Sequence, residues 1–358
     1  MNKKVLEVST GKLMYDGMTK VEISLLDNAP DDKNVDFLLG KGALSEMKLE
    51  LDKRNVNYYE GPDREYNVLR YLFFLYKLLR ANNYDIIHIH GNSATMALDL
   101  LIAKLCNVKV RIAHSHNTVT KHPILHRILQ PILSDLTTIP VACGKDAGEF
   151  LFGSKRMIVT IPNSIDVNLF KFNPIVRKKI RKELNVDNKI VLGHIGRYSY
   201  QKNHNLLIDV YYEYYKSHPN SVLILIGDGE LRESIENKIN LLGLKDNVII
   251  LGNLSNVQDI LNAMDIFLLT SRYEGLSVTA IEAQASGLPC LLSDRISKET
   301  KISDNCFFVK SSSEIQNWIE ELDKINLYKV DRLKGYEAVK ASGYDLSNLR
   351  RMVNIIWN

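Results

Sequence analysis

This chain of 358 residues has few cysteines, no long apolar run and no large excess of one sign of charge. Its four cysteines, Cys106, Cys143, Cys290 and Cys306, form no C-x-x-C pair, and most lie in apolar segments, so we expect reduced thiols in the core. No run of 18 apolar residues occurs, and the opening MNKKVLEVSTGK holds too few apolar residues for a signal peptide. We therefore expect a cytoplasmic protein, with at most a peripheral contact at the inner face of the plasma membrane.

Neither sign of charge dominates the composition. The 46 lysines and arginines against 42 aspartates and glutamates leave a formal net charge of +4, and the basic residues are scattered along the chain. Nucleic acid attracts clustered positive charge, so it is a poor partner for this protein. The mild positive charge leaves open a weak attraction to anionic membrane surfaces.

Short β-branched runs alternate with helix-length amphipathic segments through most of the chain. The runs of the first half are KVLEVST, VDFLLG, DIIHIH, VKVRIAHSH, TIPVACG and MIVTIP. The pattern restarts with KIVLGHIG, SVLILIG, NVIILGN, DIFLLT and PCLLSD. Such alternation predicts parallel sheets with helices on both faces. The restart and the chain length together predict an α/β protein with two Rossmann-like domains.

A polar, basic segment, DVNLFKFNPIVRKKIRKELNVDNK, separates the two sets of runs. It has a helical pattern and no strand pattern, so we place the linker near residues 168 to 175. At the end of the chain, SGYDLSNLRRMVNIIWN predicts a final helix capped by Asp345 or Ser347. The apolar face of that helix needs a groove in which to lie.

Two glutamates stand out in the segment YEGLSVTAIEAQASGLPCLLSD. Glu274 follows a buried strand, at the edge where open α/β sheets bind ligands. Glu282 is the one charge in a helix that Ser277 caps and Gly287 ends. Sugar hydroxyls could donate to both carboxylates, and the free amides at the helix start suit a phosphate. The alternative is a buried Glu282 paired with amides or a basic partner, and a Glu274 that is merely solvated.

This segment resembles the E-x7-E motif of the retaining glycosyltransferases of family four, also called group 1. The resemblance implies the GT-B fold, in which two Rossmann-like domains face each other across a cleft and a C-terminal helix returns to the N-terminal domain. The implied ranges are 1–170 for an acceptor-binding domain, 171–342 for a donor-binding domain and 343–358 for the returning helix. The sequence is similar above all to bacterial members of this family that build capsule or exopolysaccharide.

Several other segments carry the same resemblance. GHIGRYSYQKNHNLLIDV is similar to the family's diphosphate-binding motif, and LILIGDGELRES and LGNLSNVQDIL to the loops beside the nucleotide base. The donor-binding residues implied are Gly17, Gly196, Arg197, Lys202, Gly227, Asp228, Gly252, Glu274, Gly275, Leu276, Ser277 and Glu282. The catalytic residues implied are His116, Arg197, Lys202 and Glu274. Without the glutamate segment, we would favour interpreting Arg197 and Lys202 as surface charge on a strand-to-helix loop.

The first half departs from the family at one point. TGKLMYDGMTKVEISL takes the place of the first glycine-rich loop, but the paired glycine is replaced by Asp16, so only Gly17 carries over. VRIAHSHNT matches the strand end whose histidine approaches the donor sugar, which implies His116, with His114 as the alternative. VTIPNSIDVNLF is similar to the segment at the domain junction, with Ser164 in place of a glycine. Without the resemblance, a histidine at a strand end is an ordinary hydrogen-bonding residue.

The resemblance implies transfer of a sugar from a nucleotide diphosphate, most often a UDP-linked hexose or N-acetylhexosamine, to a hydroxyl of a glycan acceptor, often lipid-linked. No D-x-D motif occurs, which agrees with a donor site without metal, and no cofactor is expected beyond the co-substrate. The two cations would stabilise the charge that gathers on the leaving diphosphate. The expected mechanism is a front-face displacement with retention of configuration.

Three alternatives compete with this hypothesis. A nicotinamide-dependent dehydrogenase lacks support because no strand is followed by G-x-G-x-x-G. Another GT-B enzyme, such as a nucleotide-sugar epimerase, would share the architecture, and a non-catalytic sugar-binding subunit of a polysaccharide complex would lack turnover. Separately, the basic and apolar segment KHPILHRILQPIL (121–133) could rest on a membrane if its apolar face is exposed, or could be an ordinary helix packed on the sheet.

Overall fold

The computed structural model describes residues 3–14, 16–162, 164–310 and 314–358. The chain divides into two compact units, one formed by Met1–Ser164 with Leu346–Asn358 and the other by Ile165–Asp345. The division lies before the boundary expected after residue 170, because Ile165, Val167 and Phe170 are buried in the core of the second unit.

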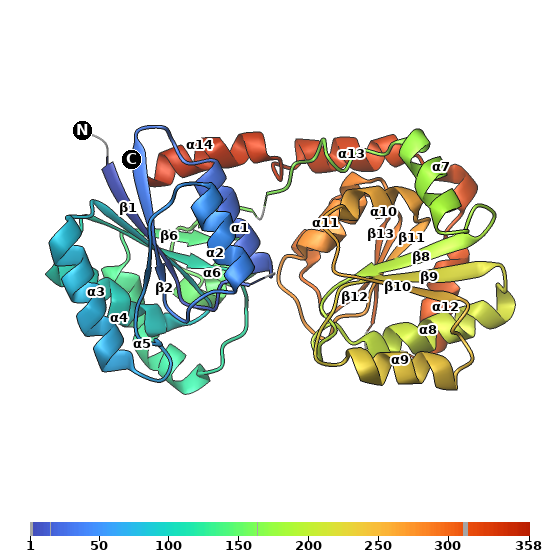
Figure 1. Cartoon of the computed structure of the whole chain (residues 1–358), viewed down its shortest axis with the longest axis horizontal. Helices are drawn as coiled ribbons and strands as arrows, with labels where there is room; N and C mark the ends of the chain where they lie inside the picture. Colours follow the sequence, from blue (N-terminus) through green and yellow to red (C-terminus); the bar gives the residue numbers. More distant parts are fainter. Residues whose placement is uncertain (1–2, 15, 163, 311–313) are drawn as a thin grey trace. The chain divides into compact units, whose positions relative to one another are not determined.

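The first unit holds a seven-stranded parallel sheet in the order β3-β2-β1-β4-β5-β6-β7 (Figure 1). Its strands are β1 (Lys3–Ser9), β2 (Lys33–Leu39), β3 (Tyr58–Glu60), β4 (Ile86–Gly91), β5 (Val110–Ser115), β6 (Ile139–Ala142) and β7 (Val159–Thr160). The strand order reverses between β1 and β4, and the carboxyl ends of strands at such a switch point are where open α/β sheets bind ligands.

Helices cover both faces of this sheet, because strands buried on both faces need two apolar layers. One layer consists of α3 (Val68–Asn82), η1 (Ala94–Met96), α4 (Ala97–Leu105), α5 (Pro123–Leu136) and α6 (Lys145–Phe152). The other consists of α1 (Gly17–Asp27), α2 (Ser45–Lys53) and the C-terminal helix α14 (Leu346–Ile356). Leu349, Val353 and Ile356 of α14 are buried in the same apolar cluster as residues of α1 and α2, so the last helix belongs to the first unit.

The second unit repeats the architecture with a six-stranded parallel sheet in the order β10-β9-β8-β11-β12-β13. The strands are β8 (Ile190–Ile195), β9 (Ser221–Ile226), β10 (Val248–Gly252), β11 (Ile266–Leu269), β12 (Cys290–Ser293) and β13 (Cys306–Val309). The helices are α7 (Pro174–Glu183), α8 (His204–Ser217), α9 (Arg232–Leu241), α10 (Val257–Ala263), α11 (Val278–Ala285), η2 (Lys298–Thr300), α12 (Ile315–Lys324), η3 (Leu327–Lys329) and α13 (Arg332–Ala341). The two Rossmann-like domains predicted from the sequence are confirmed.

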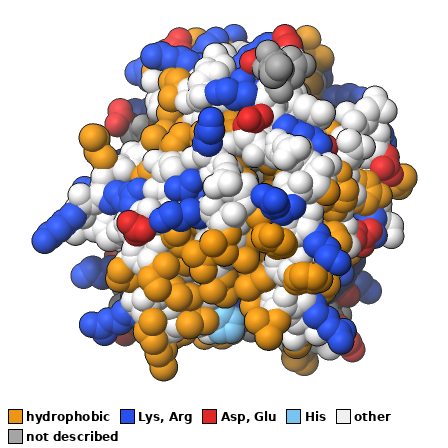
Figure 2. Space-filling view, turned by 90° about the vertical axis from the view of Figure 1, so that its left-hand side faces the viewer, with side chains coloured by type: hydrophobic (Ala, Val, Ile, Leu, Met, Phe, Trp, Pro, Cys, Tyr) orange, Lys and Arg blue, Asp and Glu red, His pale blue; other side chains and the backbone are white. Residues whose placement is uncertain are grey.

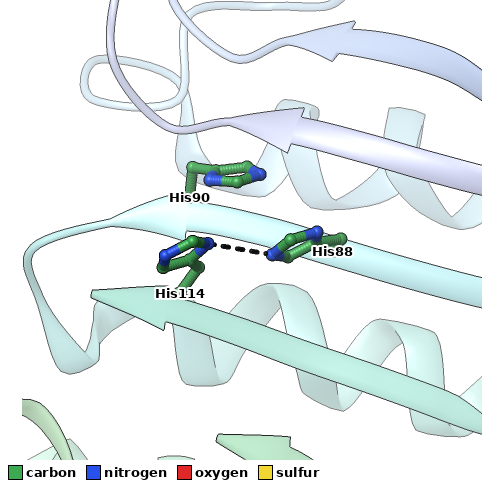
Figure 3. A group of neighbouring side chains, drawn as sticks. All are labelled: His88, His90 and His114. Carbon is green, nitrogen blue, oxygen red and sulfur yellow. Dashed lines mark hydrogen bonds between the residues drawn. The ribbon is translucent and has the colours of Figure 1, made fainter. Parts of the chain in front are cut away.

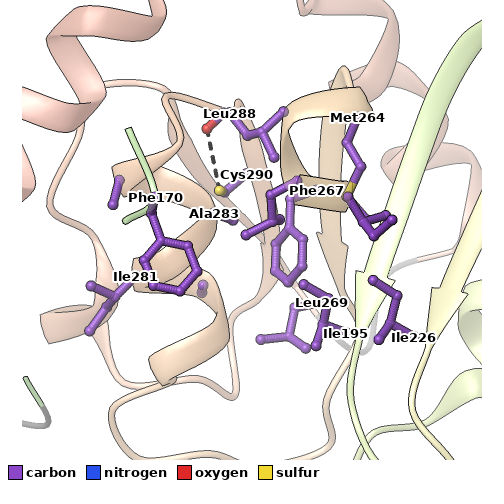
Figure 4. Close-up of a cluster of buried hydrophobic side chains, with 14 of the residues drawn as sticks. Phe170, Ile195, Ile226, Met264, Phe267, Leu269, Ile281, Ala283, Leu288 and Cys290 are labelled. Carbon is purple, nitrogen blue, oxygen red and sulfur yellow. Dashed lines mark hydrogen bonds between the residues drawn. The ribbon is translucent and has the colours of Figure 1, made fainter. Parts of the chain in front are cut away.

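Phe267 lies at the centre of one apolar layer of the second unit (Figure 4). Phe170, Ile281 and Cys290 are buried in the same cluster, which joins the segment before α7 to helix α11 and strand β12. The four cysteines are free thiols, and Cys106 is the one among them that is partly exposed. Within the described residues, no helix is both long and apolar enough to cross a membrane.

Helix α11 ends where helix α13 approaches it most closely. Gly287 adopts φ +72° after the helix, and a Cβ there would lie 2.1 Å from the carbonyl oxygen of Arg332. The Arg332 guanidinium donates through Nε to the carbonyl of Ser286 at 2.7 Å. A side chain at Gly287 would therefore have to separate these two helices.

We expect Gly287→Ala to lower the free energy of unfolding by about 3 kcal/mol or more, because it combines a left-handed backbone with a backbone clash. Gly243→Ala is the matched control: Gly243 has φ +68° but no atom within 4 Å of the added Cβ. Its cost should be about 1 kcal/mol, from the backbone conformation alone. Urea unfolding followed by circular dichroism measures both, and equal losses would contradict the close approach.

Candidate active site

Two predicted residues of the second unit, Lys202 and Glu274, form an ion pair at the carboxyl edge of its sheet. Lys202 lies in the loop between β8 and α8, and Glu274 in the loop between β11 and α11. Because β8 and β11 are neighbours at the switch point, both loops leave the sheet side by side. Lys202 Nζ donates to Glu274 Oε1, and Ser271 Oγ donates to the same oxygen at 2.9 Å. The two charged side chains are only 17% and 7% exposed, so each charge is compensated in a largely dry site.

Backbone contacts hold these two loops together. The amide of Arg272 donates to the carbonyl of Gln201 at 2.8 Å, and Gln201 Nε2 donates to the carbonyl of Tyr273 at 3.1 Å. Thr270 Oγ1 donates to the carbonyl of Asn203 at 3.1 Å. The position of the ion pair is therefore set by the scaffold rather than by the two long side chains alone.

Buried polar groups lie beneath Lys202. The rings of His194, at the end of β8, and His204, at the start of α8, are 4.6 Å apart. Burial lowers the pKa of His194 to about 3 and that of His204 to about 2, and the nearby Lys202 charge adds to both shifts. Both rings are therefore neutral at pH 7, and Lys202 carries the positive charge of this cluster.

Helix α11 begins at Val278 after Ser277, as predicted, and Glu282 is buried on it at 4% exposure. Ser277 Oγ makes no capping hydrogen bond within the described residues, and its contact at 3.3 Å is with Thr279 Oγ1. The first amides of the helix are thus not taken up by the side chain of their own cap, which leaves the positive end of the helix suited to an anion. Gly275 and Leu276 are half-buried in the preceding turn.

The remaining predicted cation, Arg197, lies on the surface. Its Nη2 is 3.1 Å from Glu230 Oε2, and both side chains are more than half exposed. Asp228 is likewise paired with Arg232 Nη1 at 3.1 Å. Exposed pairs of this kind contribute little to stability, so a ligand phosphate could replace the carboxylate partner of Arg197 at small cost.

The predicted glycines Gly196, Gly227 and Gly252 join three loops at this edge. The amide of Gly196 donates to the carbonyl of Ile226 at 2.9 Å, and that of Gly227 donates to the carbonyl of Gly252 at 2.8 Å. Gly227 has φ +132°, and a Cβ there would lie 2.1 Å from the carbonyl oxygen of Gly196. The absence of a side chain at Gly227 therefore lets its backbone lie against the loop that contains Gly196.

The first unit brings four histidines and one glutamate together at the carboxyl ends of β1, β4 and β5. Glu7 pairs in register with His88, and His90 with His114. Side chains alternate along a strand, so these residues share the sheet face of Val5, Ile86 and Ile112, which is covered by α1, α2 and α14. Figure 3 shows the rings of His88, His90 and His114 gathered at this edge.

Two hydrogen-bonded branches start from Glu7. In one, Glu7 Oε2 is 2.5 Å from His90 Nε2, and His90 Nδ1 is 2.9 Å from His116 Nε2. In the other, Glu7 Oε1 is 3.0 Å from His88 Nδ1, and His88 Nε2 is 3.2 Å from His114 Nδ1. The predicted His116 and its alternative His114 are thus both present, each at the end of one branch, with ring centroids 4.2 Å apart.

Electrostatics keeps Glu7 ionised and the outer histidines neutral. Burial acts to raise the pKa of Glu7, but His88 and His90 outweigh it and lower that pKa to about 2. Burial, with the neighbouring rings adding to it, lowers the pKa of His114 and of His116 well below the usual value. Burial also lowers the pKa of His90, although Glu7 opposes the shift.

A second buried carboxyl, Glu22 on α1, was not predicted. Burial raises the pKa of Glu22 well above its usual value, and the nearby Glu7 and Asp16 charges add to this. Both of its oxygens lack a hydrogen-bond partner among the residues that the structure describes. Asp16, which replaces the family's glycine, caps α1 by accepting from the amide of Thr19 at 2.9 Å, and Gly17 is the first residue of that helix.

Comparison with protein families gives two matches. Residues 176–332 match the model of glycosyl transferases group 1, and residues 35–169 match that of glycosyltransferase family 4. Among related proteins, EpsF of Bacillus subtilis, which is named as a glycosyltransferase, is 32% identical over 318 residues, covering 83% of this chain and 80% of its own length. The UDP-Gal:alpha-D-GlcNAc-diphosphoundecaprenol alpha-1,3-galactosyltransferase of Escherichia coli is 29% identical, covering 73% of this chain and 68% of its own.

Solved structures agree with the fold. HepE of Anabaena, crystallised in complex with UDP, superimposes with a TM-score of 0.81 over 98% of each chain. At 18% sequence identity this likeness concerns the fold alone. The predicted GT-B class, with its two Rossmann-like domains, is confirmed.

The neutral histidines predict loss of stability on acidification. His90, His114 and His116 have folded pKa values below the unfolded value near 6.5, so protonation favours unfolding. The stabilisation that these groups provide is complete above about pH 6.5 and is lost progressively as the pH falls below it. Glu7, with a folded pKa of about 2, adds a loss only below about pH 4.5.

A Trp318→Phe variant makes this testable in the first unit, because it leaves Trp357, buried beside His88, as the single tryptophan. We expect the urea midpoint reported by Trp357 fluorescence to fall between pH 7 and pH 5.5. A midpoint that is constant or rises over this range would contradict the neutral, buried state of the rings.

Proposed function

Because this chain belongs to the group 1, family 4 glycosyltransferases and is therefore a sugar-transferring enzyme, we propose a specific reaction for it. The enzyme transfers a hexose or N-acetylhexosamine from a UDP-sugar to a hydroxyl of a lipid-linked glycan, in the synthesis of a cell-surface polysaccharide. The transfer proceeds without metal and with retention of the anomeric configuration. The observation that carries this proposal is the buried Lys202–Glu274 ion pair at the carboxyl edge of the second sheet.

The ion pair supplies both groups that a diphosphate sugar needs. An incoming diphosphate, with more negative charge than one carboxylate, competes with Glu274 for Lys202. Arg197 exchanges its exposed contact with Glu230 for the same diphosphate, and the first amides of α11 add to the anion site. Glu274 is then freed to accept hydrogen bonds from sugar hydroxyls. As the anomeric bond breaks, the fixed cations stabilise the leaving UDP.

The identity of donor and acceptor draws support from the relatives. HepE binds UDP, and the Escherichia coli relative is named for UDP-galactose and a diphosphoundecaprenol-linked sugar. On the basis of these two relatives, we assign uridine as the base. A polyprenyl-linked acceptor in turn requires that the enzyme work at a membrane surface.

A surface on the first unit fits that requirement. Its apolar side chains come from the adjacent helices α3, α4 and α5 and are exposed: Leu69, Phe73, Tyr76, Leu101, Leu105, Ile124, Leu125, Ile128 and Ile132. The lower part of Figure 2 shows apolar side chains gathered on this side of the molecule, with lysines and arginines around them. The segment 121–133 thus packs on the sheet through one face and exposes apolar side chains on another. Leu133 lies in the core, while Ile124 and Ile128 are exposed.

The charge on these helices favours an anionic membrane. The exposed charged residues of α3, α4 and α5 are Arg70, Lys77, Arg80, Lys104 and Arg127, against the single acid Asp135. Apolar side chains beside a basic rim can enter the headgroup region while the cations bind lipid phosphates. We therefore propose peripheral binding to the inner face of the plasma membrane through this surface.

Calorimetric titration in the presence of a chelator tests the donor site. We expect UDP to bind, and Lys202→Met to weaken binding by roughly tenfold or more, because a charge-assisted contact is lost. Lys216→Met, on the surface of α8 and paired with Glu213, is the matched control and should leave the affinity unchanged. Glu274→Gln should not weaken UDP binding, and can strengthen it, because it removes the carboxylate that competes for Lys202. It should lose turnover of the UDP-sugar, because the contact with the sugar hydroxyls is lost. Binding that requires a divalent metal, or that ignores Lys202, would overturn the proposal.

Sedimentation with vesicles tests the membrane surface. Wild-type protein should bind vesicles of phosphatidylglycerol and phosphatidylcholine, more weakly as salt rises and weakly to phosphatidylcholine alone. The double variant Ile124→Ser, Ile128→Ser should lose roughly tenfold in affinity, because two buried aliphatic side chains are removed from the bilayer. The control Ile175→Ser, Leu241→Ser removes equally exposed residues of the second unit and should bind like wild type. Equal behaviour of the two double variants would contradict this assignment.

A further inference from the structure

The Glu7 branches in the first unit have a directional property that the donor site does not use. Glu7 is fully buried and ionised, so each of its oxygens can only accept a hydrogen bond. Its Oε2 is 2.5 Å from His90 Nε2, so the ring proton of His90 lies on Nε2. A neutral His90 then has a lone pair on Nδ1.

That lone pair determines the next ring. His90 Nδ1 is 2.9 Å from His116 Nε2, so His116 must carry its proton on Nε2 to make this hydrogen bond. A neutral His116 is left with a lone pair on Nδ1. This nitrogen is buried and has no hydrogen-bond partner within the part of the chain that the structure describes. The amide of His116 donates to Asn92 Oδ1 at 3.2 Å, which helps to hold the residue after the end of β5.

The second branch repeats the pattern and provides an internal control. Glu7 Oε1 faces His88 Nδ1 at 3.0 Å, and His88 Nε2 faces His114 Nδ1 at 3.2 Å. The indole Nε1 of Trp357 also lies 3.3 Å from His88 Nδ1. If Nδ1 carries the proton, it can donate to Glu7 but cannot accept a hydrogen bond from Trp357. We assign the proton to Nδ1 because the contact with Glu7 is shorter and its carboxylate is charged and buried. Removing His88 should therefore disturb His114 but not His116.

A metal ion is the competing explanation for these rings. Nitrogens of His88, His90 and His114 lie within 4.8 Å of one another. However, the closest approaches are pairwise, His88 to His114 and His90 to His116, at distances of ordinary hydrogen bonds. Each of the four nitrogens in these ring-to-ring contacts is thus turned to one other ring, as a hydrogen-bonded chain requires.

We propose that Glu7 and His90 are positioning residues that hold His116 in the Nε2–H tautomer, so that its Nδ1 lone pair accepts a hydrogen bond from a sugar hydroxyl. Glu7 stands to His90 and His116 as an orienting carboxylate stands to a catalytic imidazole. Neither Glu7 nor His90 touches substrate in this role. The inference rests on the proposed transferase function for its kinetic consequence, whereas the tautomer itself can be observed without turnover.

Nitrogen-15 NMR of the histidine rings in the wild-type protein tests the tautomer directly. We expect His90 and His116 to be neutral at pH 7.5 with the proton on Nε2, assigned by comparison with His90→Phe and His116→Phe. A proton on Nδ1 of His116, or a single zinc ion per chain that shifts these resonances, would overturn the proposal whatever the activity.

The two branches then supply matched variants for kinetics. His90→Phe should leave His116 as a mixture of tautomers, lower kcat for the UDP-sugar by roughly tenfold or more, and change the Kd of UDP by less than about twofold. His88→Phe should leave both the His116 resonances and kcat close to wild type. Circular dichroism checks that each variant is folded.

The outcomes separate the two proposals. Correct tautomers with no UDP-sugar turnover by the wild type would overturn the proposed function and leave the His116 tautomer established. Full turnover by His90→Phe, or an equal loss in His88→Phe, would overturn the positioning role while the transferase stands.

Discussion

A charge buried in protein needs an opposite charge or hydrogen-bond donors, and this requirement governs both halves of the chain. Each unit holds one such charge at the carboxyl edge of its parallel sheet, where the central strands end and the chain turns into helices. Glu7 is held by two imidazoles in the first unit, and Lys202 is held by Glu274 in the second. The strands that lead to these positions are buried in the apolar clusters of the two units.

The two edges are prepared for different tasks. In the second unit, Lys202 already has an anionic partner, so the cost of burying its charge is met before any ligand arrives. In the proposed function, a diphosphate exchanges one anion for another. The neighbouring rings of His194 and His204 stay neutral, so Lys202 carries the positive charge of that cluster. In the first unit, the carboxylate does not face outward. It is hydrogen-bonded to two histidine branches. The outermost nitrogens of these branches, His114 Nε2 and His116 Nδ1, have no hydrogen-bond partner among the described residues.

Much of this could be predicted from the sequence, because parallel strands and their helices follow from local patterns. The eleven apolar runs all became strands, and the E-x7-E segment became a loop and a buried helix. Two strands were not predicted: β3 has three residues at a sheet edge, and β13 is four residues long. The division before Ile165 was missed because it depends on which core receives Val167 and Phe170, which is a tertiary property.

The partners of the site residues could not be predicted in the same way. A pairing such as Lys202 with Glu274, 72 positions apart, depends on which strands are neighbours in the sheet. The histidine branches did leave a signal, since H-x-H occurs at the ends of two strands and places alternate residues on one face, together with a glutamate in KVLEVS. Only the strand order β1-β4-β5 showed that these residues meet.

A crystal structure of the protein with UDP, grown in the presence of a chelator, tests the central claim most directly. We predict that the diphosphate lies at the carboxyl edge of the second sheet, with Lys202 Nζ turned from Glu274 to a phosphate oxygen. Arg197 should lie within hydrogen-bond distance of the diphosphate, and the α11 amides should face it. UDP bound elsewhere, or bound here with the Lys202–Glu274 pair intact, would contradict it.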